Sequence, residues 1–138
     1  MIINYNEKIA IIYAISAIAC ADGNFSKEES TLRSKVAIFL GLSNDDNSAV
    51  QSMTLTECSR IISTMSYDNK KFTAMVLMQT IMADGVELQI ERKILNIISS
   101  TSNLPFVSPN EAYNYLKELG IIGRNASLIW GTLRYGAK

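Results

Sequence analysis

Histidine is absent from this chain of 138 residues, and proline and glycine are scarce. Without histidine there is no imidazole to act as a general base, to activate a serine or cysteine nucleophile, or to bind a metal. Only 2 prolines and 7 glycines are present, whereas an all-β protein needs a turn signal every few residues. Histidine-dependent catalysis is therefore excluded, and an all-β fold is disfavoured.

Charge of one sign is not concentrated anywhere. The 13 basic and 13 acidic residues cancel, and the only basic doublets are Lys70-Lys71 and Arg92-Lys93. Such a chain would release few counterions from a phosphate backbone, so we expect no nucleic-acid binding. No glycine-rich phosphate loop is present either.

The two cysteines, Cys20 and Cys58, are isolated within apolar stretches, and we predict two small buried thiols rather than a disulfide. The first stretch, residues 9–21, is similar to a signal peptide because it ends Ala-Cys-Ala. However, Glu7 lies where a signal peptide carries basic residues, and the apolar stretch is too short to cross a bilayer. We therefore predict a buried helix in a cytoplasmic protein without membrane insertion.

Hydrophobic residues make up 48% of the chain, as in globular proteins. The most informative feature of the sequence is an internal repeat. Residues 18–29 align with residues 80–91 at a constant offset of 62, with an apolar run before each copy and an i, i+4 apolar stripe after it. The matched residues are Asp22 with Asp84, Gly23 with Gly85, and Glu29 with Glu91. Each copy predicts a helix, a tight Asp-Gly turn and a second helix.

The residues of each turn indicate how it is built. Gly23 and Gly85 can adopt the left-handed conformation that ends a helix. In the first copy Ser26 and Glu29 have the spacing of a capping box, which begins the next helix. The second copy has Leu88 at the cap position, so it lacks this box.

The remaining segments complete an all-α pattern without strand-like alternation. We expect a polar loop over residues 41–47, a helix near 54–65 and a turn over 67–71. Ser108, Pro109 and Glu111 predict the start of a helix that ends at Gly120. A last helix is expected over residues 126–135. We assign residues 1–104 to the repeat domain and residues 105–138 to a C-terminal helical extension packing on the same domain.

The paired Ala-Asp-Gly turns, each with a glutamate seven residues after the aspartate, resemble the TerB-like family of tellurite-resistance proteins. The resemblance covers residues 1–104. It implies a TerB-like helical bundle of two pseudo-repeated helix-turn-helix units, a cytoplasmic location, a role in stress response and an acidic site for a divalent cation. Carried onto this sequence, the metal-site residues are Asp22, Glu29, Asp84 and Glu91. TerB-like modules occur in diverse proteins, so tellurite itself is not implied.

Three interpretations of the acidic turns remain open. Their six carboxylates suit a hard cation such as Ca²⁺, Mg²⁺ or Mn²⁺; these belong to Asp22, Glu28, Glu29, Asp84, Glu87 and Glu91. The first turn is similar to the second half of a calcium-binding EF-hand loop, but Ile18 and Cys20 stand at its first ligand positions, so only half-loops acting together would bind an ion, weakly. Alternatively, the carboxylates only cap helices, or they form an acidic patch for a protein partner.

Two further groups have alternative roles. Met75, Met78 and Met82 form a helical stripe that belongs either to the core or to a groove for a partner helix. The tail is rich in aromatic residues, which either pack over the core or form an interface: Tyr113, Tyr115, Trp130 and Tyr135.

Together these features predict a non-enzymatic interaction or stress-response module with a weak divalent-cation site and a protein partner. The first alternative is a scaffold or regulatory subunit that binds its partner without metal. The second is a metal-dependent hydrolase that uses the carboxylates. The sequence does not determine the oligomeric state.

Overall fold

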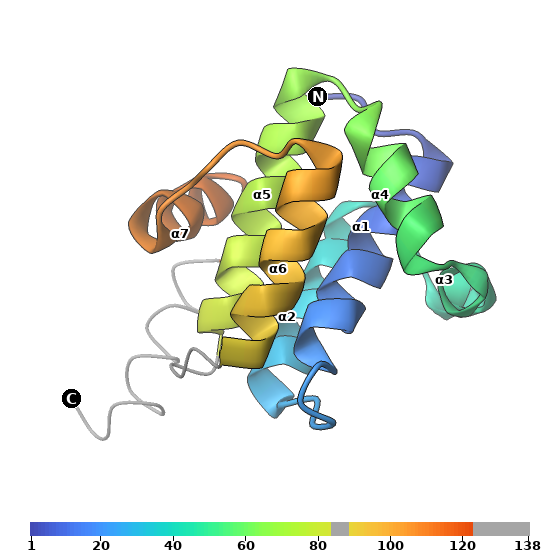
Figure 1. Ribbon diagram of the computed structural model, residues 1–138, viewed down its shortest axis with the longest axis horizontal. Helices are drawn as coiled ribbons and strands as arrows, with labels where there is room; N and C mark the ends of the chain where they lie inside the picture. Colours follow the sequence, from blue (N-terminus) through green and yellow to red (C-terminus); the bar gives the residue numbers. More distant parts are fainter. Residues whose placement is uncertain (84–88, 123–138) are drawn as a thin grey trace.

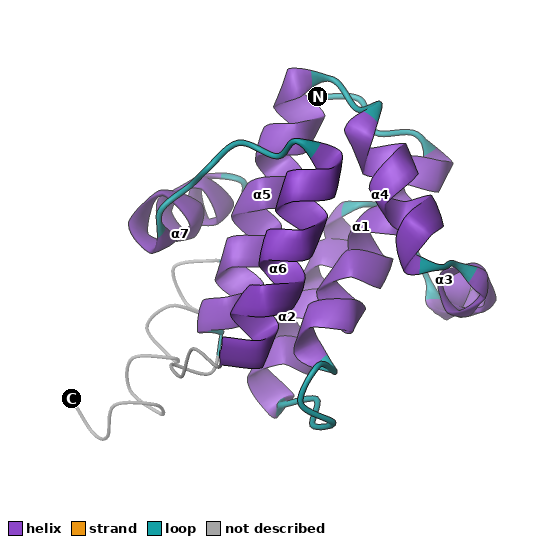
Figure 2. Ribbon diagram, viewed as in Figure 1, coloured by secondary structure: helices purple, strands orange, loops and turns teal. Residues whose placement is uncertain are grey.

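The computed structural model describes residues 1–83 and 89–122, and helices are the only regular structure in these ranges (Figures 1 and 2). The elements in chain order are α1 (Tyr5–Ala19), α2 (Lys27–Phe39), the 3₁₀ turn η1 (Asn44–Asp46), α3 (Asn47–Ser52), α4 (Leu55–Ser63), α5 (Tyr67–Met82), α6 (Gln89–Ser102) and α7 (Pro109–Glu118). The all-α prediction is confirmed. The second Asp-Gly turn and the helix expected over residues 126–135 lie outside the described residues.

The sequence repeat is also a structural repeat. Helices α1 and α5 begin at Tyr5 and Tyr67, and α2 and α6 begin at Lys27 and Gln89, so both pairs keep the same offset. In Figure 1, α1 and α5 run in one direction while α2 and α6 run in the other. The four helices therefore form a bundle in which each repeat contributes one antiparallel pair.

A hydrogen bond joins the two repeats at equivalent positions. Asn69 Nδ2 in α5 donates to Glu7 Oε1 in α1 at 3.3 Å, and these residues are 62 apart. Two equivalent residues can touch only near the axis that relates them. The pseudo-two-fold axis of the bundle therefore passes between the first turns of α1 and α5.

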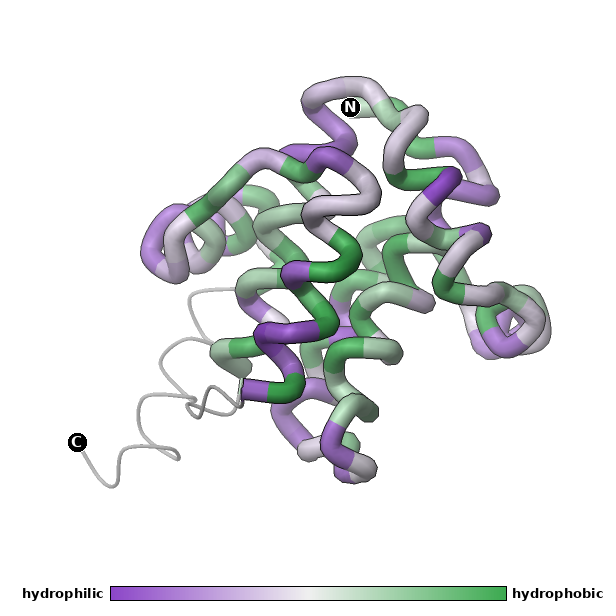
Figure 3. The backbone as a smooth tube through the Cα atoms, in the orientation of Figure 1, coloured by the Kyte–Doolittle hydropathy of each residue, from purple (hydrophilic) through white to green (hydrophobic). Residues whose placement is uncertain are grey.

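The core is built around α1 and α5. Helix α1 contacts α2, α3, α4, α5 and α6, and α5 also contacts α7. Because neighbours surround these two helices, their apolar residues are buried on several sides, which explains the near-continuous apolar runs in the sequence. Figure 3 shows the hydropathy of each residue along the chain. Met75 and Met78 are 4% exposed and Met82 is half-buried, so the methionine stripe belongs mainly to the core.

The C-terminal extension begins with α7, whose predicted start is confirmed. Ser108 and Glu111 form a capping box, Pro109 occupies the first turn, and Gly120 follows the helix with φ of +80°. Helix α7 packs on α5, and the rings of Tyr115 and Phe72 lie 6.4 Å apart. Tyr113 and Tyr115 are half-buried against the core, while Trp130 and Tyr135 lie outside the described residues.

Two segments differ from their prediction. Residues 41–47 are not a plain loop, because η1 and the start of α3 lie within them. Tyr5 Oη donates a hydrogen bond to Asp46 Oδ1 at 2.8 Å and so joins η1 to α1. Local sequence patterns do not predict this contact, because the two residues are far apart in the chain. Helix α5 begins at Tyr67 rather than after a turn at 67–71, because Ser66 Oγ accepts from the Asn69 backbone N–H and caps it.

The prediction of two buried thiols is correct for one cysteine and wrong for the other. Cys58 is fully buried, its Sγ lies 3.3 Å from the Ala10 carbonyl oxygen, and burial raises its pKa to about 12. Cys20 is exposed, because it caps the carboxyl end of α1 where the chain leaves the bundle.

Candidate functional site

The first acidic turn lies at the end of the bundle where α5 ends and α6 begins. This turn connects Ala19 at the end of α1 to Lys27 at the start of α2, and the flanking helix ends of the second repeat are Met82 and Gln89. Since α1 and α5 run in the same direction, their carboxyl ends lie at one end of the molecule (Figure 1). We call this region the acidic end. Asp84 and Glu87 of the second turn lie outside the described residues.

The first turn is held by its own backbone and by Asp22. Gly23 has φ of +85°, the left-handed conformation expected for it, and its N–H donates to the Cys20 carbonyl oxygen at 2.9 Å. The Asn24 N–H donates to Asp22 Oδ1 at 2.9 Å. Asp22 is exposed, so its side chain is accessible to solvent.

Glu29 forms the predicted capping box but is almost completely buried. Its Oε1 accepts from the Ser26 N–H at 2.9 Å, and its own N–H donates to Ser26 Oγ at 3.0 Å. The residue is 1% exposed, and its Oε2 is a buried atom without a hydrogen-bond partner. Burying a carboxylate oxygen without a partner is costly, because the water it loses is not replaced.

Capping alone does not explain this burial. Ser108 and Glu111 make the same capping box at the start of α7, with distances of 2.9 and 3.1 Å, yet Glu111 is exposed. There the hydrogen bonds from Ser108 hold the pKa of Glu111 below its ordinary value. A capping glutamate therefore works at the surface, and Glu29 is buried for another reason.

Glu91 repeats the burial of Glu29 in the second copy. It lies in the first turn of α6, at the position equivalent to Glu29, and is also 1% exposed. Their neighbours differ, because half-buried Glu28 corresponds to Ile90, which is 45% exposed. A fully buried glutamate is thus a shared property of both repeats, whereas the flanking residue is not.

Cys20 and Arg33 belong to the surroundings of Glu29, although the sequence did not indicate this. The pKa of Cys20 is raised first by partial burial, then by the negative charges of Glu29 and Asp22, and is lowered by Arg33. Asp22 and Glu29 therefore both act electrostatically on one thiol. Arg33 Nε donates to Ser16 Oγ at 2.8 Å, a bond that joins α2 to α1.

The described residues bring together only part of the predicted metal site. Within residues 1–83 and 89–122 there is no group of three or more histidine, cysteine, aspartate or glutamate side chains placed to hold a metal ion. Asp22 and Glu29 share the first turn, Glu91 occupies the equivalent place in the second repeat, and Asp84 lies outside these ranges.

These features define an all-helical protein of two pseudo-symmetric helix-turn-helix units with buried glutamates at one end. The family model described as tellurite resistance protein TerB matches residues 2–52, so the chain is similar to TerB over α1, α2 and α3, and the resemblance seen in the sequence is confirmed for this part of the chain. No curated protein matches the chain.

A solved structure shares the fold beyond the first repeat. The crystal structure of a protein of unknown function from Porphyromonas gingivalis W83 superposes with a TM-score of 0.70 at 23% identity, covering 85% of this chain and 92% of that one. At this identity the match shows the fold alone. Among the described residues, no helix is both long and apolar enough to cross a membrane.

Proposed function

We propose that this protein is a non-enzymatic TerB-like interaction module of the cytoplasm, acting in a stress response, whose acidic end binds a divalent cation and thereby controls contact with a protein partner. The TerB match and the two-fold repeat support the module assignment. The cation site is supported by the burial of Glu29 Oε2.

The observation that carries the cation site is the buried Oε2 of Glu29, which has no hydrogen-bond partner. A carboxylate is buried at a tolerable cost only when it is paired or coordinates a metal. A cation bound to Oε2 would compensate the charge while Oε1 remained in the capping box with Ser26. Asp22, in the adjoining turn, would offer a second oxygen from the solvent side.

The ligands available determine the class of ion. Carboxylate oxygens without histidine suit Ca²⁺, Mg²⁺ or Mn²⁺. The site residues we propose are Asp22 and Glu29 from the first repeat and Asp84 and Glu91 from the second. Since each turn supplies only half of a calcium-type loop, we expect modest affinity.

Thermal unfolding with and without cations tests this proposal. A cation that binds only the native state raises the midpoint in a concentration-dependent way. Glu29→Gln keeps the volume and the capping oxygen but removes the charge. We expect it to raise the midpoint of the cation-free protein and to abolish the shift caused by Ca²⁺, Mg²⁺ or Mn²⁺.

Glu111→Gln is the matched control, because it alters the same capping box at an exposed position. It should leave the cation-induced shift unchanged. An absence of any shift in the wild type at millimolar cation would contradict the cation site. A shift that survives in Glu29→Gln and in Asp22→Asn/Asp84→Asn would place the ion elsewhere.

The second candidate is a scaffold or regulatory subunit that uses the acidic end without metal. It is favoured by Asp22, which is exposed and accepts a hydrogen bond from the Asn24 N–H, together with the half-buried Glu28. In that case Glu29→Gln would still stabilise the protein, but no cation would shift the wild-type midpoint.

A further inference from the structure

Helix α4 covers only part of the surface that α1 and α6 form together. The Cys58 Sγ of α4 donates to the Ala10 carbonyl oxygen, in the first half of α1, at 3.3 Å. The Thr101 Oγ1, in the last turn of α6, donates to the Ser59 Oγ of α4 at 3.1 Å. Helices α1 and α6 contact each other and run in opposite directions. The second half of α1 therefore adjoins the first half of α6, between α4 and the acidic end (Figure 1).

Helix α6 carries an apolar stripe on the face that bears Thr101. Ile97, Ile94 and Ile90 precede Thr101 by four, seven and eleven residues, which keeps them on one side of the helix. Ile90 is 45% exposed, Ile97 is 37% exposed and Ile94 is half-buried. The intervals of four, three and four residues are those of the seam of a coiled coil. The stripe starts at the contact with α4 and runs towards the acidic end.

Helix α1 contributes a second row beside this stripe. Tyr13 and Ala17 follow Ala10 by three and seven residues, so they lie on the face of α1 that bears α4, and both are half-buried. Cys20 follows Ala17 by three residues and is exposed. We call the six residues of the two rows the α1–α6 surface: Tyr13, Ala17, Cys20, Ile90, Ile94 and Ile97.

The bundle does not require apolar side chains at the exposed positions of the stripe. The equivalents of Ile90 and Ile97 in α2, one repeat offset earlier, are Glu28 and Lys35. Helices α2 and α6 nevertheless begin at equivalent positions and bury equivalent glutamates. The two exposed isoleucines are thus not needed for the packing of the bundle. Exposed apolar surface of this kind is typical of a protein–protein interface.

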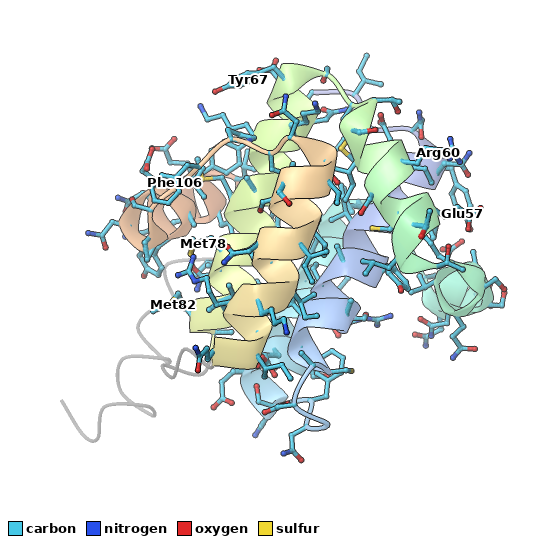
Figure 4. The ribbon with its side chains drawn as sticks, viewed as in Figure 1. Glu57, Arg60, Tyr67, Met78, Met82 and Phe106 are labelled. Carbon is cyan, nitrogen blue, oxygen red and sulfur yellow. The ribbon has the colours of Figure 1, made fainter. Side chains whose placement is uncertain are left out.

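We propose that the α1–α6 surface binds an amphipathic helix of a protein partner, whose apolar stripe is flanked by acidic residues. Helix α4 shows how such a helix packs beside it. It buries Cys58 and Ile62, while Glu57 and Arg60 are exposed and point away from the bundle (Figure 4). A partner helix would extend the interface that α4 already makes with α1 and α6. This inference names the contact surface of the proposed interaction module and rests on that assignment, but it does not depend on the cation site.

Charge complementarity favours an acidic partner over a second copy of the chain. Lys93 is exposed on the solvent side of the stripe, between Ile90 and Ile94 in the sequence. Charges at such flanking positions select the partner of a helix, and like charges there are unfavourable. A second copy packed by the same stripe would bring another lysine to this flank, whereas a glutamate or aspartate of a partner helix would pair with Lys93. The other exposed residues on this side of α6 are uncharged: Gln89, Asn96 and Ser100.

Two fluorescein-labelled helical peptides test the surface and its charge preference together. Both would carry leucines at alternating intervals of four and three residues, with glutamates beside them in one peptide and lysines in the other. Fluorescence anisotropy with the full chain in EDTA should show several-fold tighter binding of the glutamate peptide, and Lys93→Glu should reverse this preference. The bound peptide should also slow the alkylation of exposed Cys20, while buried Cys58 stays unmodified.

The first repeat supplies the test substitutions and their control. Ile90→Glu/Ile97→Lys gives α6 the residues that α2 carries at the equivalent positions, so the helical circular dichroism should persist and most of the peptide binding should be lost. Ile38→Ser is the matched control, because Ile38 is 74% exposed on α2, outside the α1–α6 surface, and its equivalent in α6 is Ser100. This variant should bind the peptide as the wild type does.

Unchanged binding in Ile90→Glu/Ile97→Lys, or a preference of the wild type for the lysine peptide, would overturn the proposal. Self-association of the wild type that the same double substitution abolishes, measured by sedimentation, would also overturn it, because a second copy would then cover the surface. Binding in EDTA supports the surface whatever the cation-induced thermal shift shows, so a failure of the cation site is distinguishable. A cation-induced shift without peptide binding would overturn the α1–α6 surface alone.

Discussion

Asn103 has the same left-handed backbone conformation as Gly41, its equivalent in the first repeat, with φ of 56° against 77°. Both residues end a long helix, α2 and α6 respectively, and the following leucine closes the turn with the same backbone hydrogen bond. Asn103 is the only residue other than glycine with positive φ among residues 1–83 and 89–122. The two repeats thus end equivalent helices with the same backbone conformation, at a glycine in one repeat and at an asparagine in the other.

This relationship predicts opposite effects of two substitutions. Asn103→Gly should increase the free energy of unfolding by a few tenths to about 1 kcal/mol, because glycine adopts positive φ without steric cost. Gly41→Ala should decrease it by about 1–2 kcal/mol, since nothing crowds the new Cβ and only the backbone conformation is strained. Urea unfolding followed by circular dichroism measures both. A destabilised Asn103→Gly variant would show that the asparagine side chain makes an essential contact.

The two thiols should differ sharply in reactivity. Cys20 is exposed and Cys58 is buried, with its pKa raised to about 12. An alkylating reagent should therefore modify Cys20 alone in the folded protein and both residues in denaturant, as measured by mass spectrometry of the peptides. Modification of Cys58 at the same rate as Cys20 under native conditions would contradict the burial of α4 on α1.

The raised pKa of Cys58 also predicts a loss of stability in base. The unfolded thiol ionises near its ordinary pKa of 9.0, whereas the folded thiol stays protonated up to about pH 12. The stabilising difference is complete below pH 9 and is lost as the pH rises towards 12. Thermal midpoints measured from pH 8 to 11 should fall less steeply for Cys58→Ala than for the wild type, after allowance for the lower starting stability of the variant.

The tie between η1 and α1 predicts a change at acidic pH. Hydrogen bonds from Ser43 and then Tyr5 hold the pKa of Asp46 below its ordinary value of 3.8. Its contribution to stability is therefore present above about pH 4 and is lost as the pH falls through the lower folded pKa. Tyr5→Phe should bring the pKa of Asp46 closer to 3.8, which NMR titration of the carboxyl carbon would detect. An unchanged pKa would mean that the hydrogen bond from Tyr5 does not contribute to the lowering.

The repeat, and with it most of the bundle, could be predicted from sequence because its signals are local. The apolar runs, the Ser26 and Ser108 capping boxes and Gly23 each act within a few residues, so their spacing predicted α1, α2 and α7. Helix α3 was missed because its six residues, of which only Ala49 and Val50 are apolar, are too few to show an apolar periodicity. Its place depends on the contact of Tyr5 with Asp46, which is remote in sequence.

The site was less predictable because burial is a property of packing. Glu29 and Glu111 stand in the same Ser-x-x-Glu pattern, and the pattern alone assigns them the same role. The bundle buries Glu29 and leaves Glu111 exposed to solvent, so only the first becomes a candidate ligand. For the same reason the sequence did not indicate that Cys20 shares the electrostatic surroundings of Glu29.

The two repeats could hold one shared cation or one cation each, and substitutions of the two buried glutamates distinguish these arrangements. Glu29 and Glu91 are equivalent and equally buried, each in the first turn of a helix that begins at the acidic end. If one ion is held by both repeats, Glu29→Gln and Glu91→Gln should each abolish most of the cation-induced thermal shift, and the double variant should lose little more. Non-additivity of this kind is expected for residues that share a ligand. If each repeat binds its own ion, each single variant should still bind one ion, and isothermal titration calorimetry should show about half of the wild-type binding enthalpy. Only the double variant should then lose all binding. Unchanged binding in Glu91→Gln together with loss in Glu29→Gln would confine the site to the first turn, where Asp22 and the buried Oε2 of Glu29 lie.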